Sequence, residues 1–180
     1  MQLAAEIPVI ETERLTLREP READLPAMVA FHTSERAAHV GGPLDEWAVF
    51  VRLAANLGQW MLRGHGWWTL EDRATGAVAG RCGVGWATDY PEPELGWHVY
   101  EGFEGRGLAH EAALAARRWW TGRGNPPPIS LIGPENTRSR HLAERMGAAV
   151  DGEFNLRGKP ALIYRHPSED AAATTRGRLS

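Results

Sequence analysis

The chain has 180 residues, a formal net charge of −3 and a 43% share of hydrophobic residues. This is an ordinary globular composition, and it argues against a basic surface for nucleic acid or a surface for membranes. No apolar run reaches the roughly 18 residues of a membrane-spanning helix. The single cysteine, Cys82, cannot form an internal disulfide, which favours a reducing compartment, and we expect a cytoplasmic protein.

Length and composition predict one folded domain over residues 1–166 and a flexible tail over residues 167–180. A chain of this size can bury most of its apolar surface in a single core. The first ten residues contain Glu6 and Pro8 and no basic stretch, so we expect no signal peptide. The tail is polar and rich in Ala and Thr, and chain ends of this kind are commonly poorly ordered.

The first third of the chain predicts one strand and two helices. Residues 14–18 alternate between polar and apolar side chains, which is typical of a strand. Asp24 is expected to cap a helix over residues 25–31. Asp45 opens a second helix that continues to about Arg63, and its apolar residues recur at helical spacing.

Residues 67–71 and 77–86 predict two strands joined by a hairpin loop with Gly76 late in the turn. The second run contains glycine at positions 80, 83 and 85. Glycine inside a strand indicates a bulge or a close approach of another backbone.

The stretch from Glu94 to Glu111 combines a strand, a Gly-rich turn and a helix. Residues 95–100 form an apolar, aromatic run, and residues 108–120 contain neither Pro nor Gly. The turn between them has glycine at positions 102, 105 and 107. Its backbone N–H groups and the positive end of the helix dipole make a site for an anion, most often a phosphate.

Three familiar sites are excluded at this turn. No Lys follows the glycines, as a Walker motif requires, and a dinucleotide fingerprint that starts at Gly105 fails at His110. The pair His110-Glu111 resembles the start of a zinc-protease motif, but Leu114 stands where the second His is needed. We therefore expect no metal site.

The last third predicts a short strand over residues 129–132, a helix over 138–146 and two further strands near 149–156 and 161–166. Gly147 follows the helix, as expected of a helix end. Asn136 is well suited to cap its beginning.

Two motifs resemble those of the GNAT superfamily of acyl-CoA-dependent N-acetyltransferases. Residues 104–109, Glu-Gly-Arg-Gly-Leu-Ala, resemble its motif A, although Glu104 replaces the usual Gln or Arg. Residues 136–147 resemble a second signature of the family, N-x-x-S-x-x-[L/V]-x-E-[K/R]-[L/M]-G. Together with the lead-in over residues 11–18, they are similar to the RimJ/RimL-like branch, which acetylates the N-termini of ribosomal proteins.

The resemblance covers roughly residues 10–165 and implies an α/β (α+β) GNAT fold. That fold has a central mixed, mostly antiparallel twisted sheet, here expected to contain about six or seven strands flanked by about four helices. The strand that ends near Val99 and the strand near Leu131 are expected to splay apart. The pantetheine arm of acetyl-CoA would lie in the gap.

The resemblance also implies which residues bind acetyl-CoA. The N–H groups of the Gly-rich turn would hold the pyrophosphate, and the backbone of the preceding strand would hold the pantetheine and the acetyl carbonyl. Asn136 would contact the pantetheine besides capping its helix. The cofactor-binding set is Trp97, Val99, Gly105, Arg106, Gly107, Leu108, Ala109, His110 and Asn136.

Two residues are candidates for the chemistry. Glu94 is at a position where family members often carry a base for the amine, and its alternative is an exposed carboxylate at a strand end. A free Glu titrates near pH 4.3, so Glu94 would need desolvation or a water relay to act at pH 7. Ser139 is at the position thought to donate a proton to the departing thiolate, and its alternative is an ordinary first-turn serine. Ala143 occupies the position of the tyrosine acid of other family members.

We therefore expect an enzyme that transfers the acetyl group of acetyl-CoA to a primary amine by direct attack in a ternary complex. The acceptor is a peptide N-terminal α-amine or a small amine metabolite. The second hypothesis is an acyl-CoA-binding sensor or structural module without turnover. Trp67, Trp68 and Trp86 either pack in the core or line a partly aromatic acceptor pocket. The sequence does not decide the oligomeric state, and a homodimer stays open.

Overall fold

The computed structural model describes residues 6–168 of the chain. Most of the tail expected over residues 167–180 lies outside this range, as do residues 1–5. No helix within residues 6–168 is long and apolar enough to cross a membrane.

A single eight-stranded sheet forms the centre of the molecule, in the order β1-β2-β3-β4-β5-β6-β8-β7. Every neighbouring pair is antiparallel except β5 and β6, which are parallel. The strands are β1 (Ile10–Glu11), β2 (Leu15–Arg18), β3 (Trp67–Asp72), β4 (Val78–Gly85), β5 (Glu94–Val99), β6 (Ile129–Ile132), β7 (Ala149–Leu156) and β8 (Lys159–Arg165).

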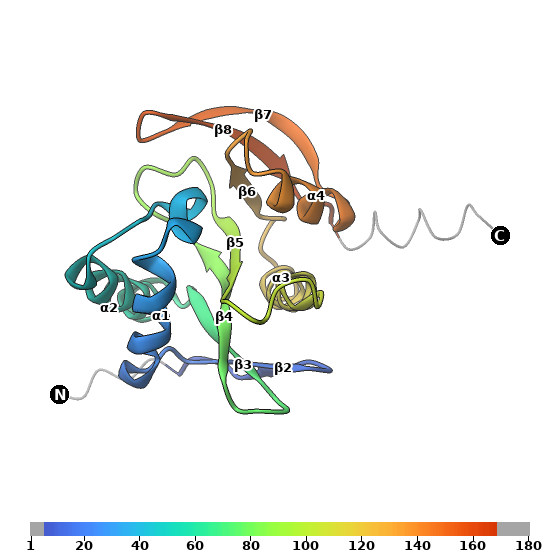
Figure 1. The fold of residues 1–180 in the computed structure, drawn as a ribbon. Helices are drawn as coiled ribbons and strands as arrows, with labels where there is room; N and C mark the ends of the chain where they lie inside the picture. The colour runs from blue at the N-terminus through green and yellow to red at the C-terminus, as the bar shows by residue number, and fades with distance from the viewer. Residues whose placement is uncertain (1–5, 169–180) are drawn as a thin grey trace.

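Helices cover both faces of this sheet. In Figure 1, α1 and α2 lie to the left of β4 and β5, whereas α3 and α4 lie to the right. The helices are η1 (Glu22–Asp24), α1 (Leu25–His32), η2 (Glu35–Val40), α2 (Glu46–Arg63), α3 (Leu108–Thr121) and α4 (Thr137–Arg145), of which η1 and η2 are 3₁₀-helices.

The alternation of side chains along each strand separates the two faces. The face toward α3 is apolar and contains the larger core cluster, including Leu17, Trp68, Leu95 and Trp97, which are at most 9% exposed. The face toward α1 and α2 packs a smaller cluster around Phe31 and also carries buried polar groups. The chemistry that the sequence suggests for Glu94 therefore belongs to the second, more polar face.

The predicted fold class and the order of the main elements are confirmed. The sheet has eight strands rather than six or seven, because Ile10–Glu11 pairs with β2 as an additional edge strand. Two residues are too few for periodicity to predict a strand. The four expected α-helices are present, and the two 3₁₀-helices, one before and one after α1, were not expected.

The glycines of β4 mark both features that the sequence suggested. The register between β3 and β4 shifts at Leu70/Glu71, which is a bulge, and Gly80 lies opposite Leu70 with φ of +153°. A Cβ at Gly83 would lie 2.2 Å from the carbonyl oxygen of Gly66. The backbones approach too closely there for any larger residue.

Asp24 does not cap α1, contrary to our expectation, because its carboxylate is the centre of a buried polar network. It accepts hydrogen bonds from Arg18 Nη1 and Nη2, at 3.0 and 2.8 Å, and one from Thr69 Oγ1 at 2.7 Å. The backbone N–H of Arg21 donates a further bond at 2.9 Å. Asp24 and Arg18 are 1% and 6% exposed, and Arg18 also pairs with Glu71. This network joins α1 to β2 and β3.

Replacing Asp24 by Ala should lower the free energy of unfolding at pH 7 by about 3–5 kcal/mol, because Arg18 loses its buried partner. Urea denaturation measures the loss. Glu19→Ala is the control: Glu19 pairs with Arg21 at 2.7 Å on the surface and should contribute less than about 1 kcal/mol. Equal effects of the two substitutions would contradict the structural role of Asp24.

Candidate active site

The two parallel strands β5 and β6 share a single bridge, between Glu94 and Ile129, and then diverge. Beyond this bridge, side chains form the hydrogen bonds between the two strands. Ser130 Oγ donates a hydrogen bond to the carbonyl of Leu95 at 2.6 Å, and the N–H of Leu131 donates to Glu94 Oε1 at 3.4 Å. The splay expected between these strands is therefore present.

A buried chain of polar groups supports Ser130 from behind. Its single hydroxyl proton goes to Leu95, so His166 Nε2 donates to Ser130 Oγ, at 2.9 Å. Arg117 Nη1 is 3.5 Å from His166 Nδ1 and donates to the carbonyl of Met146 at 2.8 Å. Burial and the charge of Arg117 lower the pKa of His166 to about 3, so the imidazole is neutral. The chain fixes the width of the splay from α3 to β5.

Glu94 lies at the point where the strands separate, on the sheet face toward α1 and α2. Its side chain is half-buried, and removal from water raises its pKa to about 7, despite the opposing effect of the Leu131 N–H. A carboxyl with this pKa can accept a proton near neutral pH, whereas an ordinary Glu cannot do so efficiently. The sequence analysis required that Glu94 be desolvated to act near pH 7, and its position in the structure provides this desolvation.

The Gly-rich turn between β5 and α3 exposes unpaired backbone donors. Gly105 and Gly107 have φ of +72° and +76°, a conformation that costs glycine nothing but strains most other residues. Gly107 is the N-cap of α3, and no side chain caps this helix. The first N–H groups of α3, on Leu108, Ala109 and His110, therefore have no helical acceptor and face the turn.

Side chains around this turn are tied to neighbouring elements. Arg106 Nη2 pairs with Asp72 at 3.1 Å, and its guanidinium lies 5.5 Å from the centre of the Phe103 ring. Glu104, which departs from the motif, forms an ion pair with Arg36 of η2. The side chain of Arg106 is thus engaged in the fold, and its backbone N–H remains the group available to a phosphate.

Glu111, which follows His110 in the first turn of α3, has a structural role. Its Oε1 accepts from Thr12 Oγ1 at 2.6 Å and from the N–H of Arg14 at 2.8 Å, and its Oε2 pairs with the Arg14 guanidinium. These partners lower the pKa of Glu111 against the effect of burial. They fasten the start of α3 to β2, so the carboxylate is not positioned as a base.

The second motif forms the loop after β6 and the first turn of α4. Asn136 Oδ1 accepts from the N–H of Ser139 at 3.2 Å, which confirms the expected N-cap. The amide nitrogen of Asn136 and the hydroxyl of Ser139 make no hydrogen bond within residues 6–168. Both polar groups are half-buried and available to a ligand. Of the strand residues, Trp97 packs in the core at 9% exposure and Val99 is half-buried.

Aromatic residues, and a loop held in place by an ion pair, lie next to Glu94. The indole of Trp67 covers Gly96: a Cβ there would lie 2.3 Å from Trp67 Cζ2. Burial, with a smaller effect of the Glu94 charge, raises the pKa of Tyr90 to about 12. Arg157, at the turn between β7 and β8, pairs with Asp89 at 2.7 Å and holds the loop in place. Trp68 is a core residue, so the core-packing alternative holds for this tryptophan.

Four residues on this face had no place in our sequence interpretation. They are His32, Arg52, Arg81 and Tyr100, and they gather near His98 between α1, α2 and the sheet. The one available signal was an arginine in the middle of a strand of small residues, Gly80-Arg81-Cys82-Gly83.

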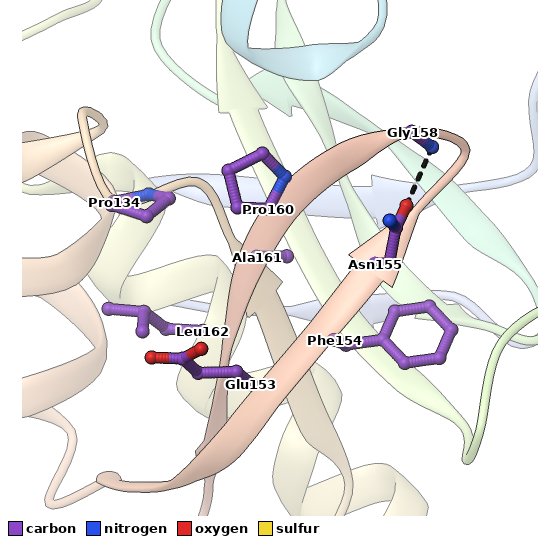
Figure 2. A pocket seen from close by; sticks show the side chains of 8 residues that line it. All are labelled: Pro134, Glu153, Phe154, Asn155, Gly158, Pro160, Ala161 and Leu162. Carbon is purple, nitrogen blue, oxygen red and sulfur yellow. Dashed lines mark hydrogen bonds between the residues drawn. The ribbon is translucent and has the colours of Figure 1, made fainter.

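A surface hollow of about 350 Å³ lies elsewhere, at the hairpin of β7 and β8 (Figure 2). The figure shows Pro134 on one side and the two strands, with the Asn155–Gly158 bond at their turn, on the other. The hollow is lined by none of the predicted site residues. Within residues 6–168, no three His, Cys, Asp or Glu side chains are grouped as metal ligands. Burial raises the pKa of Cys82, which therefore is no nucleophile.

The sequence model of the acetyltransferase (GNAT) domain family matches residues 14–149. The chain belongs to this family. It is an acyltransferase with the GNAT fold, and the resemblance seen in the sequence is confirmed at this level.

Solved structures agree with this assignment. An acetyltransferase from Agrobacterium tumefaciens str. C58 is 38% identical, with a TM-score of 0.84 over 93% of this chain and 99% of the other. A GNAT-family acetyltransferase from Bordetella pertussis is 27% identical, with a TM-score of 0.77 over 89% and 100%. RimL, a ribosomal L7/L12 α-N-protein acetyltransferase in complex with coenzyme A, is 17% identical and has the same fold, with a TM-score of 0.70 over 88% and 97%.

The GNAT fold of this chain keeps Glu94 desolvated at a cost in stability. Its pKa is about 7 when folded and near 4.5 when free, so the folded protein loses stability as pH rises from 4.5 to 7. Glu94→Gln should remove this loss and raise the free energy of unfolding at pH 8 by on the order of 1–3 kcal/mol. At pH 4 both side chains are neutral and the two proteins should unfold alike. Urea denaturation at the two pH values measures the difference, and an equal change at both would contradict the raised pKa.

Proposed function

We propose that this GNAT enzyme transfers the acetyl group of acetyl-CoA to a primary amine by direct attack in a ternary complex. The observation that carries the proposal is the Glu94 carboxyl, with its pKa of about 7, at the opening between β5 and β6. The acceptor is an N-terminal α-amine of a peptide or a small amine metabolite. The coenzyme A complex of RimL supports the choice of donor.

The donor would approach from the side of α3. The N–H groups of residues 105–110 would bind the pyrophosphate, helped by the positive end of the α3 dipole. The pantetheine would lie between β5 and β6, along the backbone of Trp97 and Val99, with Asn136 contacting it through the free end of its amide. A backbone N–H on β5 directed at the acetyl carbonyl would stabilise the oxyanion that forms during attack.

The acceptor would approach from the opposite face, where Glu94 can take its proton. The neutral amine attacks the acetyl carbonyl, the C–S bond breaks, and coenzyme A leaves as a thiolate. Ser139 would donate a proton toward the sulfur. A thiol titrates near 8.5, so the thiolate leaves readily and the loss on replacing Ser139 should be small.

The energetics favour an α-amine over a lysine side chain. An α-amine titrates near 7.7–8.0 and a lysine near 10.4, so neutralising them at pH 7 costs about 1 and 4.6 kcal/mol. A single base of pKa about 7 suits the first amine better than the second. Comparison with RimL, which is named for the α-amine of a protein, points in the same direction.

The second candidate function is a module that binds acyl-CoA without turnover. One observation favours it. Arg106 and Glu111 form ion pairs with Asp72 and Arg14, so fewer charged side chains at the turn are available for catalysis than the sequence suggests. Steady release of free thiol with a panel of amines separates the two functions.

One prediction of the proposed function concerns donor binding. Calorimetry should show micromolar or tighter binding of acetyl-CoA to the wild type, and Gly107→Asn should weaken it at least 10-fold. Asn tolerates positive φ, so the fold is retained while a side chain is added next to the unpaired N–H groups of the turn. Gly124→Asn is the matched control, because Gly124 has φ of +80° at the other end of α3 and open space around it. No heat with the wild type would remove the basis of the proposal.

Another prediction of the proposed function concerns the base. Glu94→Gln keeps an acceptor for the Leu131 N–H but cannot accept a proton, and it should lower the rate of thiol release by about 10- to 100-fold at pH 7.5. The loss should shrink at pH 9.5, where the free amine is plentiful. The wild-type rate should fall as the pH drops below about 7, as Glu94 becomes protonated. Glu46→Gln, at the exposed start of α2, is the control. A loss that is equal at both pH values would show that Glu94 is not the base.

A further inference from the structure

A cluster of polar side chains is buried between α1, α2 and the sheet, on the same face as Glu94. Arg81 of β4 and His98 of β5 are cross-strand partners, and they are 2% and 9% exposed. His32 of α1, at 0%, and Tyr100, at 5%, complete the cluster. The rings of His32 and Tyr100 lie 5.1 and 5.8 Å from that of His98.

Six polar atoms of this cluster lack hydrogen-bond partners. Arg81 Nε and Nη2, both nitrogens of His98, His32 Nε2 and the Tyr100 hydroxyl make no hydrogen bond within residues 6–168. Buried polar groups are almost always paired, and a buried charge without a partner is among the most costly arrangements in a protein. A concentration of six such atoms in four adjacent residues indicates a missing ligand.

The charge of the cluster indicates the chemical class of the ligand. Burial lowers the pKa of His32 to about 4 and that of His98 well below its usual range, so both rings are neutral at pH 7. Arg81 remains protonated, since its pKa falls only to about 10. Arg52 adds a second positive charge: its Nη1 donates to the carbonyl of Val40 at 3.0 Å and lies 3.4 Å from His32 Nδ1.

No carboxylate of the described residues neutralises Arg81 or Arg52 through an ion pair. Asp24 is near enough to affect the pKa of Arg81, but its oxygens are already occupied by Arg18, Thr69 and the Arg21 N–H. The cluster is therefore a buried cation with neutral hydrogen-bond donors around it, which is the composition of a site for a carboxylate.

The geometry relates this site to the reaction. Glu94, Gly96 and His98 lie on one face of β5. The four residue steps from Glu94 to His98 span about 13 Å along the strand. Gly96 carries no side chain, and the partly exposed indole of Trp67 lies over it, 5.4 Å from the ring of His98. An acceptor along Trp67 would have its amine at Glu94 and its other end at the cluster.

We propose that Arg81 and Arg52, with the donors of His98 and Tyr100, bind a carboxylate carried by the acceptor amine. The proposal rests on the function proposed above and narrows its acceptor to a short peptide, or a small molecule of similar length, with a free carboxylate at the end opposite the amine. The near-complete burial of Arg81 favours a small acceptor over a folded protein. Arg52, which is half-buried and contacts the Val40 carbonyl and His32 Nδ1, connects the cluster to the surface.

The first experiment measures stability and binding without turnover. Arg81→Met removes an unpaired buried charge, so its melting temperature should equal or exceed that of the wild type. Arg18→Met is the matched control, because Arg18 is equally buried but paired with Asp24, and its melting temperature should fall. Calorimetry without acetyl-CoA should show that the wild type binds N-acetyl-dialanine at least 10-fold more tightly than the corresponding amide. Arg81→Met should abolish this difference.

The second experiment measures turnover with alanine, dialanine and trialanine, each as the free acid and as the amide. At the best length, kcat/KM for the acid should exceed that for the amide by about 10- to 100-fold, as expected of charge-assisted hydrogen bonds. In Arg81→Met the ratio should fall to about 1.

Equal use of acids and amides by an active wild type would overturn this inference and leave the proposed function intact. A fall in melting temperature of Arg81→Met as large as that of Arg18→Met would assign Arg81 a structural role instead and would equally overturn it. If acetyl-CoA fails to bind, the proposed function is lost, and the calorimetry with N-acetyl-dialanine still decides whether the cluster binds a carboxylate.

Discussion

The divergence of β5 and β6 after one bridge is the constraint on which the rest of the site depends. A parallel pair that ends so early leaves backbone groups without partners inside the sheet, and such groups must be satisfied. Ser130 and Glu94 do this with their side chains, and His166 and Arg117 hold Ser130 from α3 and the end of β8. The opening is therefore a fixed feature of the fold, and Glu94 is desolvated because it stands at its edge.

The two faces of the sheet have different physical characters. Toward α3 the face is mostly apolar and well packed, and its polar groups include the chain of Ser130, His166 and Arg117 and the backbone of the Gly-rich turn. Toward α1 and α2 the face carries Glu94, His98 and Arg81, whose charges or dipoles are removed from water. Donor and acceptor would thus approach from opposite sides and meet at the splay, which needs no large movement of the helices.

Two buried arginines of this protein show how similar surroundings produce different roles. Arg18 is paired with Asp24 and Glu71 and joins α1 to the sheet, so its burial is compensated. Arg81 has no such partner, and its burial is a cost that the fold bears. Costs of this kind are commonly found where a ligand completes the site, because a group that is already satisfied has nothing left to offer a substrate.

The sequence by itself determined the fold class, most element boundaries and the two family motifs, because these depend on local periodicity, glycine positions and capping residues. Gly105, Gly107 and Asn136 could be placed from their neighbours in the chain. Only the tertiary structure decided the pKa of Glu94, the engagement of Arg106 by Asp72 and the gathering of Arg81, His32 and His98. Each of these results from contacts between residues more than 15 positions apart, and burial or charge at such distances leaves no local pattern in a single sequence.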